Sequence, residues 1–217
     1  MTTFPGSPRL LKGALVGVDP ANPLTSVILF QYNPKTLTRR LEPRATTEKR
    51  ADKTEVYRLS GPPKETITIT IEIDAADQLE RGDPQATASG VYPALSALET
   101  LVYPKSQTTI ENAALAQAGT IEIIPPEAPM TLFVWGQKRV LPVRLTSFSI
   151  TEQAYDQQLN PIRAEVELSL QVLSTADFRA AHPGHQIFLA HQIAKEAMAA
   201  SHIVNSPQQL GTSLKIA

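Results

Sequence analysis

The sequence has no cysteine, almost no net charge and no long apolar run, and each of these features excludes some classes of function. None of the 217 residues is cysteine, which excludes disulfides, thiolate metal ligands and cysteine nucleophiles and fits a reducing compartment. Lys and Arg number 20 against 21 Asp and Glu, so the net charge of −1 favours neither a nucleic-acid partner nor a membrane surface. The N-terminus, MTTFPGSPRLLKG, has no apolar signal-peptide region, and no apolar run approaches the roughly 20 residues of a membrane span. We therefore expect assembly in the cytoplasm and no direct membrane insertion.

Catalytic motifs are equally scarce. The sequence has no P-loop, GxGxxG or GxSxG pattern. Two carboxylate pairs, Asp74 with Asp77 and Glu165 with Glu167, could share acid–base chemistry. The second pair lies on the polar face of a predicted strand, where solvation or cross-strand pairing explains it more simply. We predict that the protein is not an enzyme and uses no cofactor.

All four histidines lie in the C-terminal segment. The spacing of His182, His185 and His191 could in principle hold zinc. However, Pro183-Gly184 interrupts the helical geometry that the spacing would need, and no carboxylate cluster completes a site. Surface or helix-capping histidines are the simpler interpretation, and we predict no metal site.

The sequence does contain many short strand patterns, separated by turns that hold most of its 18 prolines. The clearest strand is 65–74, where four isoleucines alternate with threonine and glutamate, and 164–172 alternates in the same way. Apolar residues alternate at Val143 and Leu145 and then, in the opposite phase, at Phe148 and Ile150, which predicts a β-bulge near Thr146-Ser147. Further strands are expected at 10–18, 26–32, from residue 36, and at 119–126, 130–136 and 143–150.

Few segments favour helix. A short helix is expected at 92–104, with Leu95, Leu98, Leu101 and Val102 on one face, whereas 106–119 is small and polar and is expected to be a loop. The Ala-rich segment 175–204 favours a C-terminal helix with an apolar stripe formed by Ile187, Ala190, Ile193, Ala194, Ala197 and Met198. Because helices do not alternate with strands, we predict a mainly β fold, an antiparallel barrel or sandwich with one packed helix over residues 1–174. Residues 175–217 are predicted to form a C-terminal helix and tail.

Two polar segments are candidates for contacts. Between Lys35 and Arg58 there are eight Lys or Arg against four Asp or Glu, and 42–53 is expected to be an exposed loop. The connection 155–161 is long and polar for a hairpin, so we expect it to project.

Three stretches, taken in order, resemble a known family. They are ILFQYNPKTLTRR, GPPKETITITIEIDAADQLE, and PMTLFVWGQKRVLPVRLTSFSITEQAYDQQLNPIRAEVELSL. The last contains Phe-x-Trp-Gly, a following strand with Ser147, and Pro161-x-Arg163-Ala164 before the final strand. Over residues 10–174 the sequence is similar to the tube-type domain of contractile injection systems, and most of all to the baseplate protein in which a LysM module usually follows that domain.

The resemblance implies a non-enzymatic subunit of the tail-tube fold. Six copies would form a ring in the baseplate, joining the inner tube to the spike or hub protein and contacting the wedge proteins. No LysM sequence follows residue 174, so attachment to the wedge would need another element. A bacteriophage tail tube or baseplate protein of the same fold is an alternative, and a ligand-binding β-sandwich is a more distant one because aromatic residues make up only 6% of the chain.

A ring-forming subunit of this family would have the following hypothetical interface residues. The polar face of the strand 65–74 is a candidate lumen wall, and the basic and hairpin segments are candidates for contacts between stacked rings. The proposed interface residues are Arg39, Arg40, Arg44, Lys49, Arg50, Thr66, Thr68, Thr70, Asp156, Gln157, Asn160 and Arg163. The proposed structural residues are Asn33, Pro34, Trp135 and Gly136.

Overall fold

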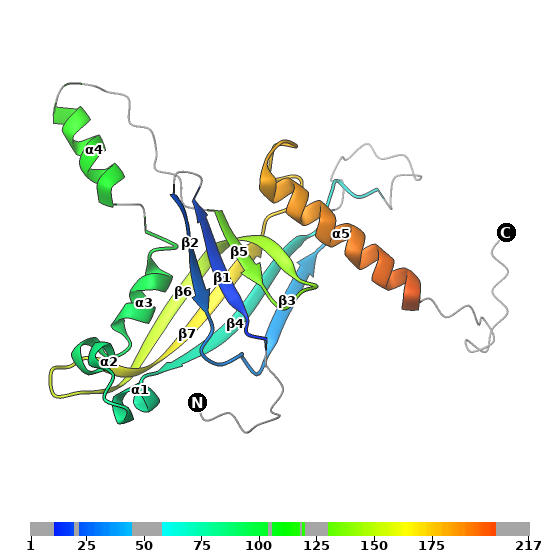
Figure 1. The fold of residues 1–217 in the computed structure, drawn as a ribbon. Helices are drawn as coiled ribbons and strands as arrows, with labels where there is room; N and C mark the ends of the chain where they lie inside the picture. The colour runs from blue at the N-terminus through cyan, green and yellow to red at the C-terminus, as the bar shows by residue number, and fades with distance from the viewer. Residues whose placement is uncertain are drawn as a thin grey trace, which may run out of the picture.

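A computed structural model describes residues 11–19, 22–44, 58–103, 106–117, 119 and 130–202. Seven strands form one antiparallel sheet in the order β2-β1-β5-β6-β7-β4-β3 (Figure 1). The strands are β1 (Ala14–Asp19), β2 (Asn22–Leu29), β3 (Leu37–Glu42), β4 (Lys64–Asp74), β5 (Met130–Val134), β6 (Val140–Tyr155) and β7 (Pro161–Val172). The helices are α1 (Ala76–Glu80), α2 (Pro84–Ser89), α3 (Tyr92–Glu99), α4 (Ser106–Gln117) and α5 (Pro183–His202).

The centre of the core is the β4–β7 pair. Ile67 lies opposite Leu170, and Ile71 lies opposite Val166, with the isoleucine face of β4 turned inward. These side chains are almost fully buried, as the alternating pattern of both strands predicted. The predicted bulge is also confirmed, because the β6–β7 register shifts between Leu145 and Ser147.

Helix α3 covers the inner face of the sheet. Leu95, Leu98 and Leu101 are buried against the core, as expected. The prediction that Val102 shares this face is wrong, since its side chain is 41% exposed. The α-helix ends at Glu99, and the amide of Val102 bonds to the carbonyl of Glu99, three residues back. That tighter turn rotates Val102 away from the core.

The prediction of a mainly β, antiparallel fold is confirmed, but the sheet does not close into a barrel. Strand β3 pairs with β4 only as far as Ile69, so the rest of β4 has no strand on that side within the described residues. Figure 1 shows α1, α2 and α3 gathered at this end of the sheet, whereas α5 lies at the opposite end. The gap between the two sheet edges is therefore occupied by helices and side chains in place of a strand ladder.

The segment that follows α3 departs from the expectations. The segment predicted as a loop at 106–119 contains α4, which buries none of its residues and stands clear of the sheet (Figure 1). Its Ala, Gln and Glu residues are good helix formers, which the loop prediction undervalued. Most of the strand expected at 119–126 lies outside the described residues.

The C-terminal helix is docked through its first half only. Gly184, Phe188 and His191 are buried, whereas Ile193 and Met198 are exposed, so the predicted apolar stripe is not the packed face. A glycine at 184 is required there because a Cβ atom would meet the ring of Phe178 at 2.6 Å. The second half of α5 projects beyond the sheet (Figure 1).

Candidate assembly surface

The threonine face of β4 points away from the core, as its pattern requires. Thr66, Thr68 and Thr70 are half-buried and lie opposite Gln171, Ser169 and Glu167 of β7, respectively. On its other side, Thr68 faces Thr38 of β3. The three threonines therefore form part of a polar strip that continues over three strands.

This strip becomes acidic towards α1. Glu72 lies directly opposite Glu165, and both side chains are exposed. Like charges on opposed strand positions repel each other, so this pair does not stabilise the sheet. Of the two explanations offered for Glu165 and Glu167, solvation fits, because both side chains are exposed, whereas neither lies opposite a cation on β4.

The proposed basic residues do not form one patch. Arg39 and Arg40 are neighbours on strand β3 and therefore face opposite sides of the sheet. Arg40 is exposed and pairs with Glu42 at 2.9 Å. The carbonyl of Arg44 accepts the amide of Ser60, whereas Lys49 and Arg50 lie outside the described residues.

Arg163 binds the neighbouring strand. Its Nε lies 2.8 Å from Oδ2 of Asp74 and its second guanidinium nitrogen 2.6 Å from the same oxygen. The carboxylate of Asp74 also caps the amide of Ala76 at the start of α1. The Asp74 carboxylate therefore pairs with Arg163 and caps α1. These two contacts explain the presence of Asp74 in the Asp74 and Asp77 pair without acid–base chemistry.

The connection between β6 and β7 is internally hydrogen-bonded around Asp156. Its carboxylate accepts the backbone amides of Gln158 and Asn160 at 2.8 Å each, and the side-chain amide of Asn160 at 2.8 Å. These bonds lower the pKa of the Asp156 carboxyl below its ordinary value. Gln157 and Leu159 are exposed, and Leu159 adopts a left-handed backbone with φ of 64°.

The tip of this connection is exposed, as expected of a projecting hairpin, but its C-terminal end is bound to the helices. The amide of Val91 donates to the carbonyl of Pro161 at 2.9 Å, and Asn160 reaches the carbonyl of Ala88 at 3.4 Å. Gly90 makes this approach possible, since any Cβ there would collide with the carbonyl oxygen of Pro161. No local pattern in 155–161 could reveal a partner that lies about seventy positions earlier in the chain.

Asn33 ties the chain before β1 to the chain after β2. Its side chain accepts the amide of Gly13 at 2.9 Å and donates to the carbonyl of Leu11 at 2.8 Å. Pro34 follows in the connection to β3, where it cannot supply a ladder N–H.

Trp135 packs beside Gly13 and against Phe133. The Trp135 and Phe133 rings are stacked with centroids 5.9 Å apart, and a Cβ on Gly13 would approach the indole to 2.8 Å. Gly136 has φ of 67° at the turn that the Trp135 amide closes on the carbonyl of Arg139. The importance of Gly13 escaped the sequence interpretation because the side chains that crowd it, Phe30 and Trp135, are distant in the sequence and follow β2 and β5.

A charged site that the sequence did not indicate lies where α5 meets the sheet. Glu65 sits on the isoleucine face of β4 and is only 3% exposed. Its carboxylate accepts Nε of Arg39 at 2.6 Å and lies 3.9 Å from Nζ of Lys195 on α5. The buried charge is thus matched from both the strand and the helix.

His191 of α5 is buried at the same junction. Desolvation and the positive charge of Lys195 lower the pKa of His191 below its ordinary value, against the raising effects of Glu65 and a hydrogen bond to the backbone of Lys138. The imidazole is therefore neutral near pH 7.

A cavity of about 310 Å³ occupies the gap between the sheet edges. Its lining includes Phe30, Ile71 and Ile73 from the sheet, and Val91 and Leu98 from the helices. Gln31 closes one end by bonding to the backbone of Asp74.

The histidines have separate surroundings. His182 stacks on Phe178 and accepts the amide of Gly184 at the start of α5. Among the described residues, no three His, Asp or Glu side chains are grouped to hold a metal ion. No helix in the described part of the chain is long and apolar enough to cross a membrane.

No protein-family model matches the sequence, and no match is found among curated proteins.

Proposed function

We propose that this chain is a structural subunit of a phage-tail-like contractile injection system. Six copies form a ring in the baseplate that joins the inner tube to the spike or hub protein and contacts the wedge. The proposal starts from the family resemblance of residues 10–174 and requires no catalytic group.

The observation that carries the proposal is the pair of different free edges of the sheet. Within the described residues β2 pairs only with β1, and β3 only with β4. Both edges expose apolar side chains: Val27 is 56%, Leu29 63% and Leu41 46% exposed. The β3 edge also carries the exposed pair Arg40 and Glu42, so the two edges differ in chemistry, and a heterologous ring needs two unlike surfaces on each copy.

The polar strip supports the assignment of a lumen wall. In a ring whose sheets continue edge to edge, Thr66, Thr68 and Thr70 would face one side together with their polar and charged neighbours on β3 and β7, which include Arg40 and Glu167. Glu72 and Glu165 add an acidic band at one end. Such a wall is hydrated and offers no apolar surface to passing cargo.

The test measures the mass of the full chain by size exclusion with light scattering, with and without the spike protein. We expect hexamers, and monomers for the double variant Val27→Lys, Leu29→Lys. Both side chains point outward because Ile28 between them packs on the core, so the fold should survive. Ile110→Lys, at a site 68% exposed on α4, which stands clear of the sheet (Figure 1), is the matched control and should remain hexameric. A chain that stays monomeric and retains neither spike nor tube protein in co-purification contradicts the proposal.

A bacteriophage tail protein would have the same ring and differ only in its genetic neighbourhood. The cavity of about 310 Å³ favours a second candidate function, a ligand-binding β domain. Among the residues that line it, Phe30 is the single aromatic side chain, which suits sugar binding poorly. Hexamer formation without any small molecule separates the two candidates.

A further inference from the structure

The cavity of about 310 Å³ between the sheet edges is apolar inside. Its buried lining residues are all apolar, and they are Phe30, Ile71, Ile73, Ala86, Val91 and Leu98. Gln31 also lines it, but the amide of this side chain is already bonded to the backbone of Asp74. Apolar walls hold water poorly, and a void of this size forfeits the contacts that close packing would supply. The cavity therefore suits an apolar group.

The described part of the chain begins beside this cavity. Nζ of Lys12 donates to the carbonyl of Gln31 at 3.0 Å, and Gln31 closes one end of the cavity. The carbonyl of Leu11 accepts the side-chain amide of Asn33 at 2.8 Å, two positions after Gln31. The segment 1–10 is therefore attached within a few residues of the cavity.

The sequence of this segment, MTTFPGSPRL, contains one aromatic residue, Phe4. Phe4 lies seven positions before Leu11, so the chain between them can span at most about 25 Å. An aromatic ring the size of benzene fits a cavity of about 150 Å³, which is well below the volume between the sheet edges. Phe4 is thus within reach of the cavity and small enough to enter it.

The charge of the segment complements the rim of the cavity. Arg9 is the one charged residue between positions 1 and 10. Asp83 lines the cavity at its exposed rim, and none of the described residues that line it is Lys, Arg or His. Over 76–89, which covers α1 and α2, Asp77, Glu80 and Asp83 stand against Arg81 alone. The rim therefore attracts a cationic segment, while the interior takes its apolar side chain.

We propose that the cavity is the docking site of this chain's own segment 1–10, with the ring of Phe4 inside it. The docked segment fills the gap between the sheet edges where no strand ladder closes the described sheet. It links the start of β1 to the helices α1, α2 and α3. This inference does not depend on the ring proposal, since the cavity and the segment belong to one copy.

A pair of introduced cysteines tests the contact without background, because the chain has no cysteine of its own. Thr3→Cys places one thiol next to Phe4, and Gln85→Cys places the other on the exposed rim. Under mild oxidation we expect an intramolecular disulfide, seen as a faster band of the monomer on a non-reducing gel.

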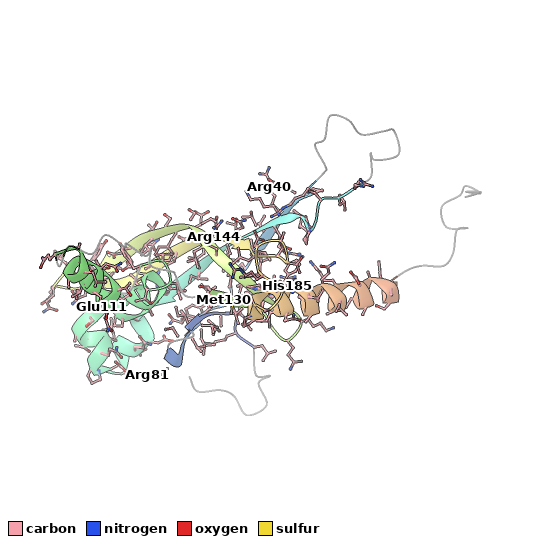
Figure 2. All side chains as sticks on the ribbon, turned by 90° about the horizontal axis from the view of Figure 1, so that it is seen from above. Arg40, Arg81, Glu111, Met130, Arg144 and His185 are labelled. Carbon is pink, nitrogen blue, oxygen red and sulfur yellow. The ribbon has the colours of Figure 1, made fainter. Side chains whose placement is uncertain are left out.

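The control pair combines Thr3→Cys with Ala194→Cys, whose second thiol is exposed on α5. Figure 2 shows Arg81, at the end of α1, on one side of the molecule, and α5 extending from His185 towards the other. The control pair should therefore lose the cross-link. The proposal is overturned if the two pairs cross-link equally, or if the pair at the rim does not cross-link. Disulfide-linked dimers in place of monomers would assign the cavity to the segment of a second copy and reject docking within one chain.

Thermal unfolding of the full chain tests the role of the ring itself. Phe4→Ala should lower Tm by about 3 °C or more, because the cavity loses its apolar occupant. Thr3→Ala is the control and should keep the wild-type Tm. Indole, a small aromatic probe, should restore part of the lost Tm in Phe4→Ala by entering the vacated cavity, and should raise the wild-type Tm less. An unchanged Tm in Phe4→Ala, or an equal rise with indole in both proteins, would show that the cavity is open to small molecules and reject Phe4 as its occupant.

Discussion

The side-chain amide of Gln31 pairs with both backbone groups of Asp74. Its Nε2 donates to the Asp74 carbonyl at 2.6 Å, and its Oε1 accepts the Asp74 amide at 2.8 Å. One side chain thereby takes the place of a strand residue across the gap between the end of β2 and the edge of β4. This contact holds the curled sheet together on the side where no strand ladder closes it.

Replacing Gln31 should loosen this closure. Gln31→Ala leaves a partly buried backbone amide and carbonyl without partners, so we expect a loss of about 1–3 kcal/mol in the free energy of unfolding. Gln31→Glu should lose at least as much, because a carboxylate cannot donate to the Asp74 carbonyl. Urea unfolding measures both, with Gln157→Ala at an exposed position as the control. If Gln31→Glu is as stable as the wild type, the reciprocal pair is not what closes the gap.

Two glycines with positive φ should respond differently to alanine. Gly82 has φ of 67° with open space around it, whereas Gly90 has φ of 56° and faces the Pro161 carbonyl. Gly82→Ala should cost only the backbone strain, about 1–2 kcal/mol. Gly90→Ala adds a steric collision with the β6–β7 connection, and we expect a loss above about 4 kcal/mol. Urea unfolding of the two variants side by side checks this, and equal losses would mean that the connection moves aside easily.

Stability should fall as the solution becomes mildly acidic. The pKa of His191 is lowered in the folded protein, so the unfolded chain binds the proton more readily. The contribution is complete above the unfolded pKa of about 6.5 and is lost as pH falls below it, at about 1.4 kcal/mol for each unit of pKa difference. Lys195, Arg139 and Glu65 are the charged side chains that act on the imidazole.

Unfolding free energies between pH 7.5 and 5.5 test this dependence. His191→Gln should flatten the profile, since glutamine does not titrate. His202→Gln, exposed at the end of α5, is the control and should keep the wild-type slope. Hydrogen exchange of the α5 amides should report the same pH dependence locally, and a slope unchanged in His191→Gln would contradict the assignment.

Regular alternation made part of the fold predictable. Four isoleucines in β4 and the apolar face of β7 bury themselves because side chains on a strand alternate sides, and this needs no distant information. The bulge at Leu145–Ser147 was visible for the same reason. In contrast, α4 was missed because its side chains bury nothing and leave no apolar period to detect.

The candidate site was less predictable. Glu65 reads as the polar start of a strand, yet register places it on the buried face, where Arg39 and Lys195 reach it from elements 26 and 130 positions away. The connection at 155–161 reads as a free polar loop, but Gly90 lets the helices bind it.

The sequence alone determined that the chain is mainly β, because the two-residue period of its strands is a local property that survives in any arrangement. Only the tertiary structure decided that the sheet stays open, which edges remain free, and which charges share the α5 junction. Those features depend on pairing between distant segments, where one buried carboxylate or one missing Cβ determines what can approach. No local sequence pattern distinguishes Glu65 from any other polar residue of a strand. Nor does any local pattern distinguish Gly90 from any other glycine in a turn.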